Sequence, residues 1–174
     1  MFPVKPTSNK PKCHPQEMRC DAAISKSIPL PLPNTPGARF LIVGPPGSGK
    51  SSWATSSLTK GGPYFRCFDS LHVIVPTNSR QSHKTDPFEG HPKTYADLTP
   101  KILGKILTEV KKDAAQGRNS CLYIDDFAFS LREKAIGKLL RAFMFNARHL
   151  RCTIMLIAVS FSSVPCQAST VPFR

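Results

Sequence analysis

Short apolar runs alternate with longer amphipathic segments along most of this 174-residue chain. Four runs are almost wholly apolar and are bounded by turn-forming residues, as is expected of buried strands. These predicted strands cover residues 39–43, 71–75, 121–124 and 153–159. Strands with apolar side chains on both faces are typical of a parallel sheet that helices cover on both sides.

The segments between these runs predict three helices. The first covers residues 51–58, directly after a glycine-rich loop. The second has Thr99 as its N-cap, a proline in its first position and apolar residues along one face, and covers 100–115. The third covers 131–146. Residues 77–93 are polar and rich in turn formers, which predicts a loop.

The composition of the first 37 residues differs from that of the rest. Eight of the 17 prolines lie there, among many lysines and serines. Such a segment can continue neither a helix nor a central strand. We therefore predict a flexible Pro/Lys-rich N-terminal arm at 1–37 and one ordered domain at 38–174.

The charge of the chain is strongly unbalanced. It has 24 Lys and Arg against 11 Asp and Glu, a formal net charge of +13. A surplus of this size indicates an anionic partner, and nucleic acid is the first candidate because Lys and Arg neutralise its phosphates. The sequence contains no secretory signal and no apolar run long enough to span a bilayer, so we expect an intracellular protein with no membrane partner.

Residues 44–51 read GPPGSGKS, a complete Walker A motif between a predicted strand and a predicted helix. Its glycines let successive backbone N–H groups curl around a phosphate, and the helix N-terminus adds partial positive charge. Lys50 is expected to reach the β- and γ-phosphates of ATP, and the Ser51 hydroxyl to bind Mg²⁺. The residues predicted to hold the nucleotide are Gly44, Pro45, Pro46, Gly47, Ser48, Gly49, Lys50, Ser51 and Ser52.

The predicted strand at 121–124 ends in two carboxylates, as in a Walker B motif. Asp125 is expected to hold the Mg²⁺ shell, and Asp126 to polarise the attacking water as a general base. One predicted strand, 71–75, lies between the two motifs in the sequence, an order typical of motor-type ATPases and unlike nucleotide kinases. We therefore predict an α/β P-loop NTPase of the RecA-like type, with a mostly parallel central sheet and helices on both faces.

Beyond the two motifs, the chain resembles the genome-packaging ATPases of large DNA viruses, within the HerA/FtsK group. The matching segments are FLIVGPPGSGKSSWATSSL, FDSLHVIVPTNS, HPKTYADLTPKILGKIL, CLYIDDF and FNARHLRCTIMLIAVS. The Arg148-His149 pair before a buried strand carries most of the resemblance. The resemblance implies that Arg148 is an arginine finger acting on a neighbouring subunit's nucleotide. It also implies a homo-oligomeric ring, double-stranded DNA and capsid proteins as partners, and a place in the host cytoplasm, nucleus or virion.

Two departures from the family leave alternatives open. The family usually has a polar sensor, often Gln, where this chain has Val159 followed by Ser160. Its members also usually continue with further strands and helices, which implies a truncated, minimal or degenerate domain here. The alternatives are a replication helicase of small circular-DNA viruses and a degenerate copy that binds nucleotide or DNA without turnover. Arg148 has an alternative role in a basic patch with Arg141 and Arg151.

Overall fold

The computed structural model describes residues 23–26, 28–29, 31–81, 86–127 and 130–160. Within these residues, five strands form a single sheet in which every pairing is parallel. The order across the sheet is β1 (Arg39–Val43), β5 (Cys152–Ala158), β4 (Ser120–Ile124), β2 (Ser70–Ile74) and β3 (Thr94–Tyr95). The carboxyl ends of all these strands therefore meet at one edge of the sheet.

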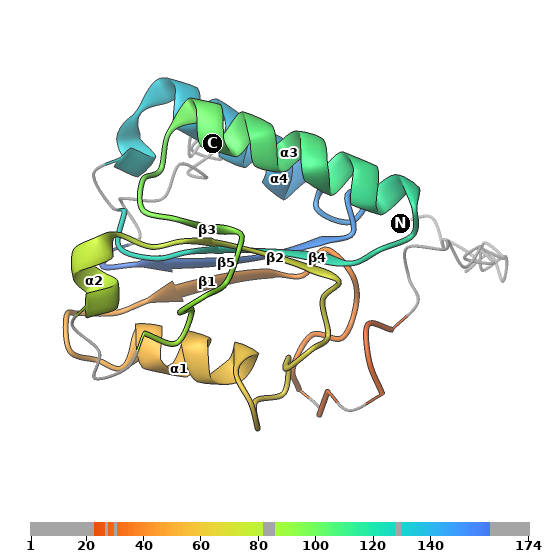
Figure 1. Cartoon of the computed structure of the whole chain (residues 1–174), viewed down its shortest axis with the longest axis horizontal. Helices are drawn as coiled ribbons and strands as arrows, with labels where there is room; N and C mark the ends of the chain where they lie inside the picture. Colours follow the sequence, from red (N-terminus) through yellow and green to blue (C-terminus); the bar gives the residue numbers. More distant parts are fainter. Residues whose placement is uncertain (1–22, 27, 30, 82–85, 128–129, 161–174) are drawn as a thin grey trace, which may run out of the picture.

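Helices cover both faces of the sheet (Figure 1). One face carries α1 (Lys50–Leu58), and the opposite face carries α3 (Pro100–Ala115) and α4 (Lys134–Asn146). Two short helices, α2 (Thr77–Gln81) and the 3-10 helix η2 (Ser130–Arg132), complete the described elements. The fold is thus α/β, as the hydrophobic pattern predicts. None of the helices in the described ranges has both the length and the apolar character needed to cross a membrane.

The core has two halves, one on each face of the sheet. Alternate side chains of β4 supply both, because successive residues of a strand point to opposite sides. Leu122 and Ile124 belong to the half under α3 and α4, whereas Cys121 and Tyr123 belong to the half under α1. All five residues of β4 are buried, so this strand lies at the centre of the domain.

The boundaries of the longer helices and strands lie close to those predicted from the sequence. α3 begins as predicted, with the Thr99 side chain accepting a hydrogen bond from the Ile102 N–H at 3.2 Å. The prediction of a loop at 77–93 is wrong at its start, because Thr77–Gln81 forms the short helix α2. The two-residue strand β3 was not predicted, since a run of two residues has no detectable period.

Part of the predicted N-terminal arm belongs to the packed domain. Ile28 is buried in the core half under α1, and the Tyr64 hydroxyl donates to the Pro33 carbonyl at 2.8 Å. Burial raises the pKa of Tyr64 to about 12, as expected of a phenol enclosed by this segment. Packing of the domain therefore begins before residue 38, while residues 1–22 lie outside the described ranges.

Candidate nucleotide-binding site

The loop from Gly44 to Gly49 joins the end of β1 to the start of α1. Gly47 and Gly49 have φ angles of 75° and 82°, in the left-handed region that residues with a Cβ rarely adopt. Lys50 is the first residue of α1, and its Nζ donates to the Pro45 carbonyl at 2.8 Å. The lysine ammonium therefore lies over the loop at a helix N-terminus, where backbone N–H groups and the helix dipole favour an anion.

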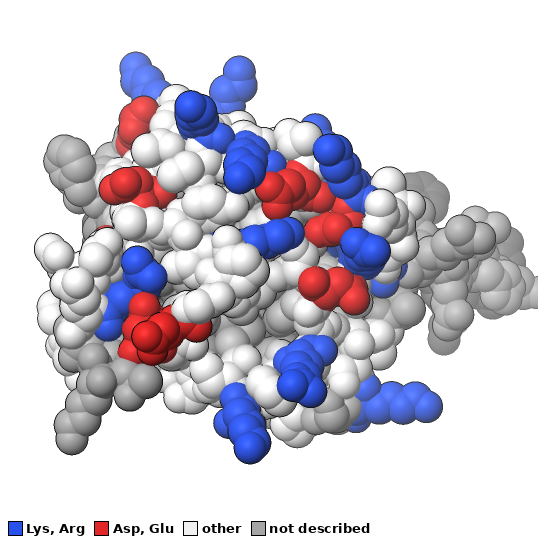
Figure 2. Space-filling view, in the orientation of Figure 1, with Lys and Arg blue, Asp and Glu red and all other residues white. Residues whose placement is uncertain are grey.

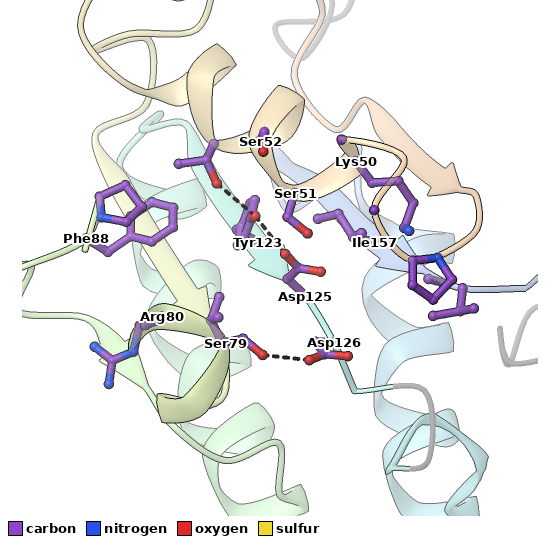
Figure 3. A pocket seen from close by; sticks show the side chains of 18 residues that line it. Lys50, Ser51, Ser52, Ser79, Arg80, Phe88, Tyr123, Asp125, Asp126 and Ile157 are labelled. Atoms are coloured by element: carbon purple, nitrogen blue, oxygen red, sulfur yellow. Dashed lines mark hydrogen bonds between the residues drawn. The ribbon is translucent and has the colours of Figure 1, made fainter. Parts of the chain in front are cut away.

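The two carboxylates that follow β4 point in different directions (Figure 3). Asp125 points toward Ser51 at the start of α1. Its Oδ2 also accepts a hydrogen bond from the Tyr123 hydroxyl at 3.2 Å, and that hydroxyl lies 3.2 Å from Thr55 Oγ1 on α1. Asp125 is only 6% exposed, so a buried polar network fixes its position beneath the loop.

Asp126 turns the opposite way, toward α2. Its φ angle is 61°, a left-handed conformation that Asp tolerates better than most residues and that turns the chain out of β4. Oδ2 of Asp126 accepts a hydrogen bond of 2.6 Å from Ser79 Oγ on α2 (Figure 3). Asp126 is exposed, in contrast to its neighbour.

Both motifs line one cavity of about 440 Å³ at the carboxyl edge of the sheet. The glycine-rich loop and the first turn of α1 form one wall, and α2 with the segment around Phe88 forms another. The Phe88 and Tyr123 rings are 5.3 Å apart, and Arg80 of α2 pairs with Asp86 at 3.2 Å. These contacts hold the second wall against β4. Five separate segments line the cavity: 46–55, 75–80, 87–88, 123–126 and 157–159.

The oxygen atoms around Asp125 suit a small hard cation. Burial raises the pKa of Asp125, and the charge of Asp126 adds to this, while hydrogen bonds from Ser51 and Tyr123 oppose it. A divalent cation between Ser51 and Asp125 would favour the ionised carboxylate. Within the described ranges, no group of three or more His, Cys, Asp or Glu could hold a metal ion. A cation here would therefore take its other ligands from phosphates and water, as Mg²⁺ commonly does.

Arg148 lies far from the cavity of its own chain. Arg148 precedes β5, at the amino edge of the sheet. Gly37 packs so closely there that a Cβ added to it would lie 2.4 Å from the backbone nitrogen of Arg148. The seven residues of β5 separate Arg148 from the cavity by roughly 20 Å. No arginine side chain spans that distance, so Arg148 does not reach the cavity of its own chain.

The residue at the predicted sensor position does reach the cavity. Val159 follows β5 directly, lines the cavity and is 46% exposed. An aliphatic side chain at this place contributes no hydrogen bond to a phosphate or a water molecule. Ser160, the next residue, is also exposed, but it is not among the residues that line the cavity.

Four polar residues that line the cavity were not predicted from the sequence: Thr55, Ser79, Arg80 and Tyr123. Thr55 and Tyr123 lie inside segments that read as ordinary helix and strand, and only the approach of α1 to β4 joins them. Ser79 lies in the segment predicted to be a loop. A signal was present for Tyr123, since a hydroxyl in an otherwise apolar strand needs a partner when it is buried.

The chain matches none of the protein-family models and none of the curated proteins with which we compared it. The interpretation of the site therefore rests on its own geometry and chemistry.

Proposed function

We propose that this protein is a Mg²⁺-dependent ATPase that acts as a DNA motor of the genome-packaging type. The observation that carries the proposal is the shared cavity, which the phosphate-type loop with Lys50 lines from one side and the Asp125–Asp126 pair from another. A glycine-rich turn without a ligand-binding role would need neither a buried carboxylate beside its serine nor a second carboxylate at the same opening.

In the proposed reaction, the backbone N–H groups of residues 44–51 hold the phosphates of ATP, and Lys50 neutralises the β- and γ-phosphates. Ser51 and Asp125 would hold Mg²⁺, which would supply further positive charge against the phosphates. Asp126 accepts a proton from the water that attacks the γ-phosphate, the bond from the γ-phosphorus to the bridging oxygen breaks, and ADP leaves. Its exposure and its position at the cavity suit that role, because a general base must reach a water molecule.

The order of the strands supports a RecA-like, motor-type domain. β5 lies between β1 and β4, so the strands that carry the two motifs are separated by two inter-strand spacings, roughly 10 Å. This separation leaves room between the loop and Asp126 for a terminal phosphate and a water molecule. Hydrolysis of ATP is therefore favoured over a function limited to the binding of a diphosphate.

The net charge of the chain supports DNA as the partner, and the position of Arg148 supports a ring of several copies. A net charge of +13 favours a polyanionic partner. Arg148 cannot reach its own cavity, so a catalytic role for it requires a neighbouring copy in a head-to-tail arrangement. Such heterologous contacts close into rings when the rotation between copies is a simple fraction of a turn. Packaging into a capsid rests on the family resemblance alone.

Val159 favours a second candidate function, a protein that binds ATP or DNA without turnover. Its aliphatic side chain lines the cavity at the place where the resembled family has a polar sensor. The two candidates differ in the hydrolysis of ATP.

The experiment that separates the two candidates compares Lys50→Ala and Asp126→Asn with the parent chain. The motor requires that Lys50→Ala weakens ATP binding, and that Asp126→Asn keeps ATP binding but abolishes phosphate release in the presence of Mg²⁺. ATP binding by the parent without phosphate release above the level of Lys50→Ala would reject the motor in favour of the second candidate.

A further inference from the structure

One line of exposed side chains runs along α4 on the side away from the sheet. The line consists of Lys134, Lys138, Arg141 and Phe145, all of which are exposed. With 3.6 residues per turn, these four positions fall within an arc of about 60° around the helix axis. The buried residues Ile136, Leu140 and Phe143 occupy the other side, and the buried Gly137 lies between them and the line. The α4 line therefore faces away from the core along the whole helix.

The positive charge of the α4 line is not balanced by nearby acidic residues of the same helix. α4 contains no Asp or Glu, and the nearest acidic residue before it, Glu133, is the N-cap outside the helix. Three ion pairs within the described ranges are Arg80–Asp86, Lys93–Glu109 and Arg118–Asp113, and none of these involves the α4 line. On the face seen in Figure 2, by contrast, Lys and Arg are interspersed with Asp and Glu.

Phe145 gives the line a second chemical character. Its side chain is 80% exposed, the largest exposure among the large hydrophobic residues of the described ranges. Arg141 lies one turn before it on the same side of the helix. Cations that flank an exposed aromatic ring are suited to nucleic acid, because phosphates bind the cations while sugars and bases pack against the ring.

We propose that the α4 line binds the phosphate backbone of double-stranded DNA, with Phe145 packed against the sugars. From residue 134 to residue 145 the line is about 16 Å long, which matches roughly five base pairs of duplex. Contacts of this type do not depend on base sequence. The partner class, DNA, comes from the proposed function, but binding to the line requires neither ATP nor turnover.

The test measures the affinity of the full chain for a labelled duplex of 30 base pairs by fluorescence anisotropy over a range of salt concentrations. Lys138→Glu should lower the affinity about tenfold at 0.1 M salt and should reduce the salt slope by about one. Lys138→Gln, a milder change, should lower it less. The matched control is Lys111→Glu, an exposed lysine of α3 with the same change in net charge. An equal loss of affinity in Lys111→Glu would overturn the proposal, because only net charge would then matter.

Phe145→Ala provides an independent arm of the same test. It should lower the affinity severalfold without changing the salt slope, because no charge is removed. Sedimentation of each variant reports its oligomeric state. A changed oligomeric state with unchanged affinity for DNA would show that α4 contacts another copy, and would overturn the proposal. ATP hydrolysis without DNA should stay at the parental level in Lys138→Glu. The DNA measurement does not depend on turnover, so absence of ATP hydrolysis in the parent chain would refute the motor but leave the test of the α4 line valid.

Discussion

Ser79 and Asp126 join α2 to the end of β4 through a hydrogen bond of 2.6 Å between Ser79 Oγ and Asp126 Oδ2. Asp126 adopts a left-handed backbone conformation at this point, with a φ angle of 61°. Such a conformation persists only when its surroundings favour it, and the contact with Ser79 is one such interaction. If Asp126 is the general base, then Ser79 is the residue that orients it.

Removal of the Ser79 hydroxyl should therefore impair the chemical step more than the binding of ATP. We expect Ser79→Ala to lower kcat about tenfold with little change in KM, and Ser79→Thr to restore most of the rate. The control is Thr108→Ala on α3, whose hydroxyl bonds to the Gly104 carbonyl at 3.0 Å, far from the cavity. A Ser79→Ala variant with parental kcat would remove Ser79 from the mechanism.

Tyr123 should support the position of Asp125 without touching the nucleotide phosphates. Tyr123→Phe removes the hydroxyl that donates to Asp125 Oδ2 and lies beside Thr55 Oγ1. Loss of these buried hydrogen bonds should cost about 1 kcal/mol of unfolding free energy and should raise severalfold the Mg²⁺ concentration needed for half-maximal turnover. Tyr95→Phe, on β3, removes a hydroxyl outside the cavity and should leave the Mg²⁺ dependence unchanged. Equal Mg²⁺ dependence in both variants would contradict the role assigned to Tyr123.

His72 should make the stability of the fold depend on pH. It is fully buried in β2, with Nε2 3.3 Å from Ser70 Oγ, and burial together with Lys93 lowers its pKa from 6.5 to about 4. The unfolded chain takes up a proton below about pH 6.5, whereas the folded chain does so only near pH 4. The neutral histidine therefore contributes stability that is fully present above pH 6.5 and is lost as the pH falls toward 4. The loss amounts to about 3 kcal/mol.

Urea unfolding between pH 7 and pH 4 measures this contribution. The parent chain and His149→Gln, which changes an exposed histidine, should lose stability to the same extent as the pH falls. His72→Gln should lose about 3 kcal/mol less over the same interval, although it starts from a lower stability at pH 7. A parallel decline in all three proteins would show that groups other than His72 dominate.

Arg148 should act between copies of the chain, because roughly 20 Å separates it from its own cavity. When Arg148→Ala subunits are mixed with parental subunits, turnover should fall more steeply than simple dilution predicts, since each variant subunit also disables its neighbour. The comparison is Arg151→Ala, which changes an arginine three residues from Arg148 in the same turn. A linear decline with the fraction of Arg148→Ala would leave Arg148 as part of a basic surface.

Much of the fold could be predicted because local signals agree with it. The apolar runs of β1, β4 and β5 have no polar interruption that favours another structure, and Thr99 with Pro100 marks the start of α3 to the residue. The glycine-rich loop specifies both its conformation and its place between β1 and α1. Each of these features depends on a few neighbouring residues.

The rest of the site depends on contacts that sequence order does not reveal. Ser79 lies 47 residues from Asp126 in the chain, and Thr55 lies 68 residues from Tyr123. These pairs meet only because β2 and β4 are neighbours in the sheet and α1 packs on β4. The order of the strands across the sheet determines which of these residues come into contact. The apolar pattern of each strand does not specify that order.

The most direct test of the account is ATP hydrolysis by the full chain with Mg²⁺, measured with and without double-stranded DNA and with Lys50→Ala as the blank. We predict turnover above the blank and a clear increase when DNA is added. Turnover equal to the blank under both conditions would contradict the proposal of a motor. Turnover above the blank that does not change when DNA is added would contradict the proposal that DNA is its partner.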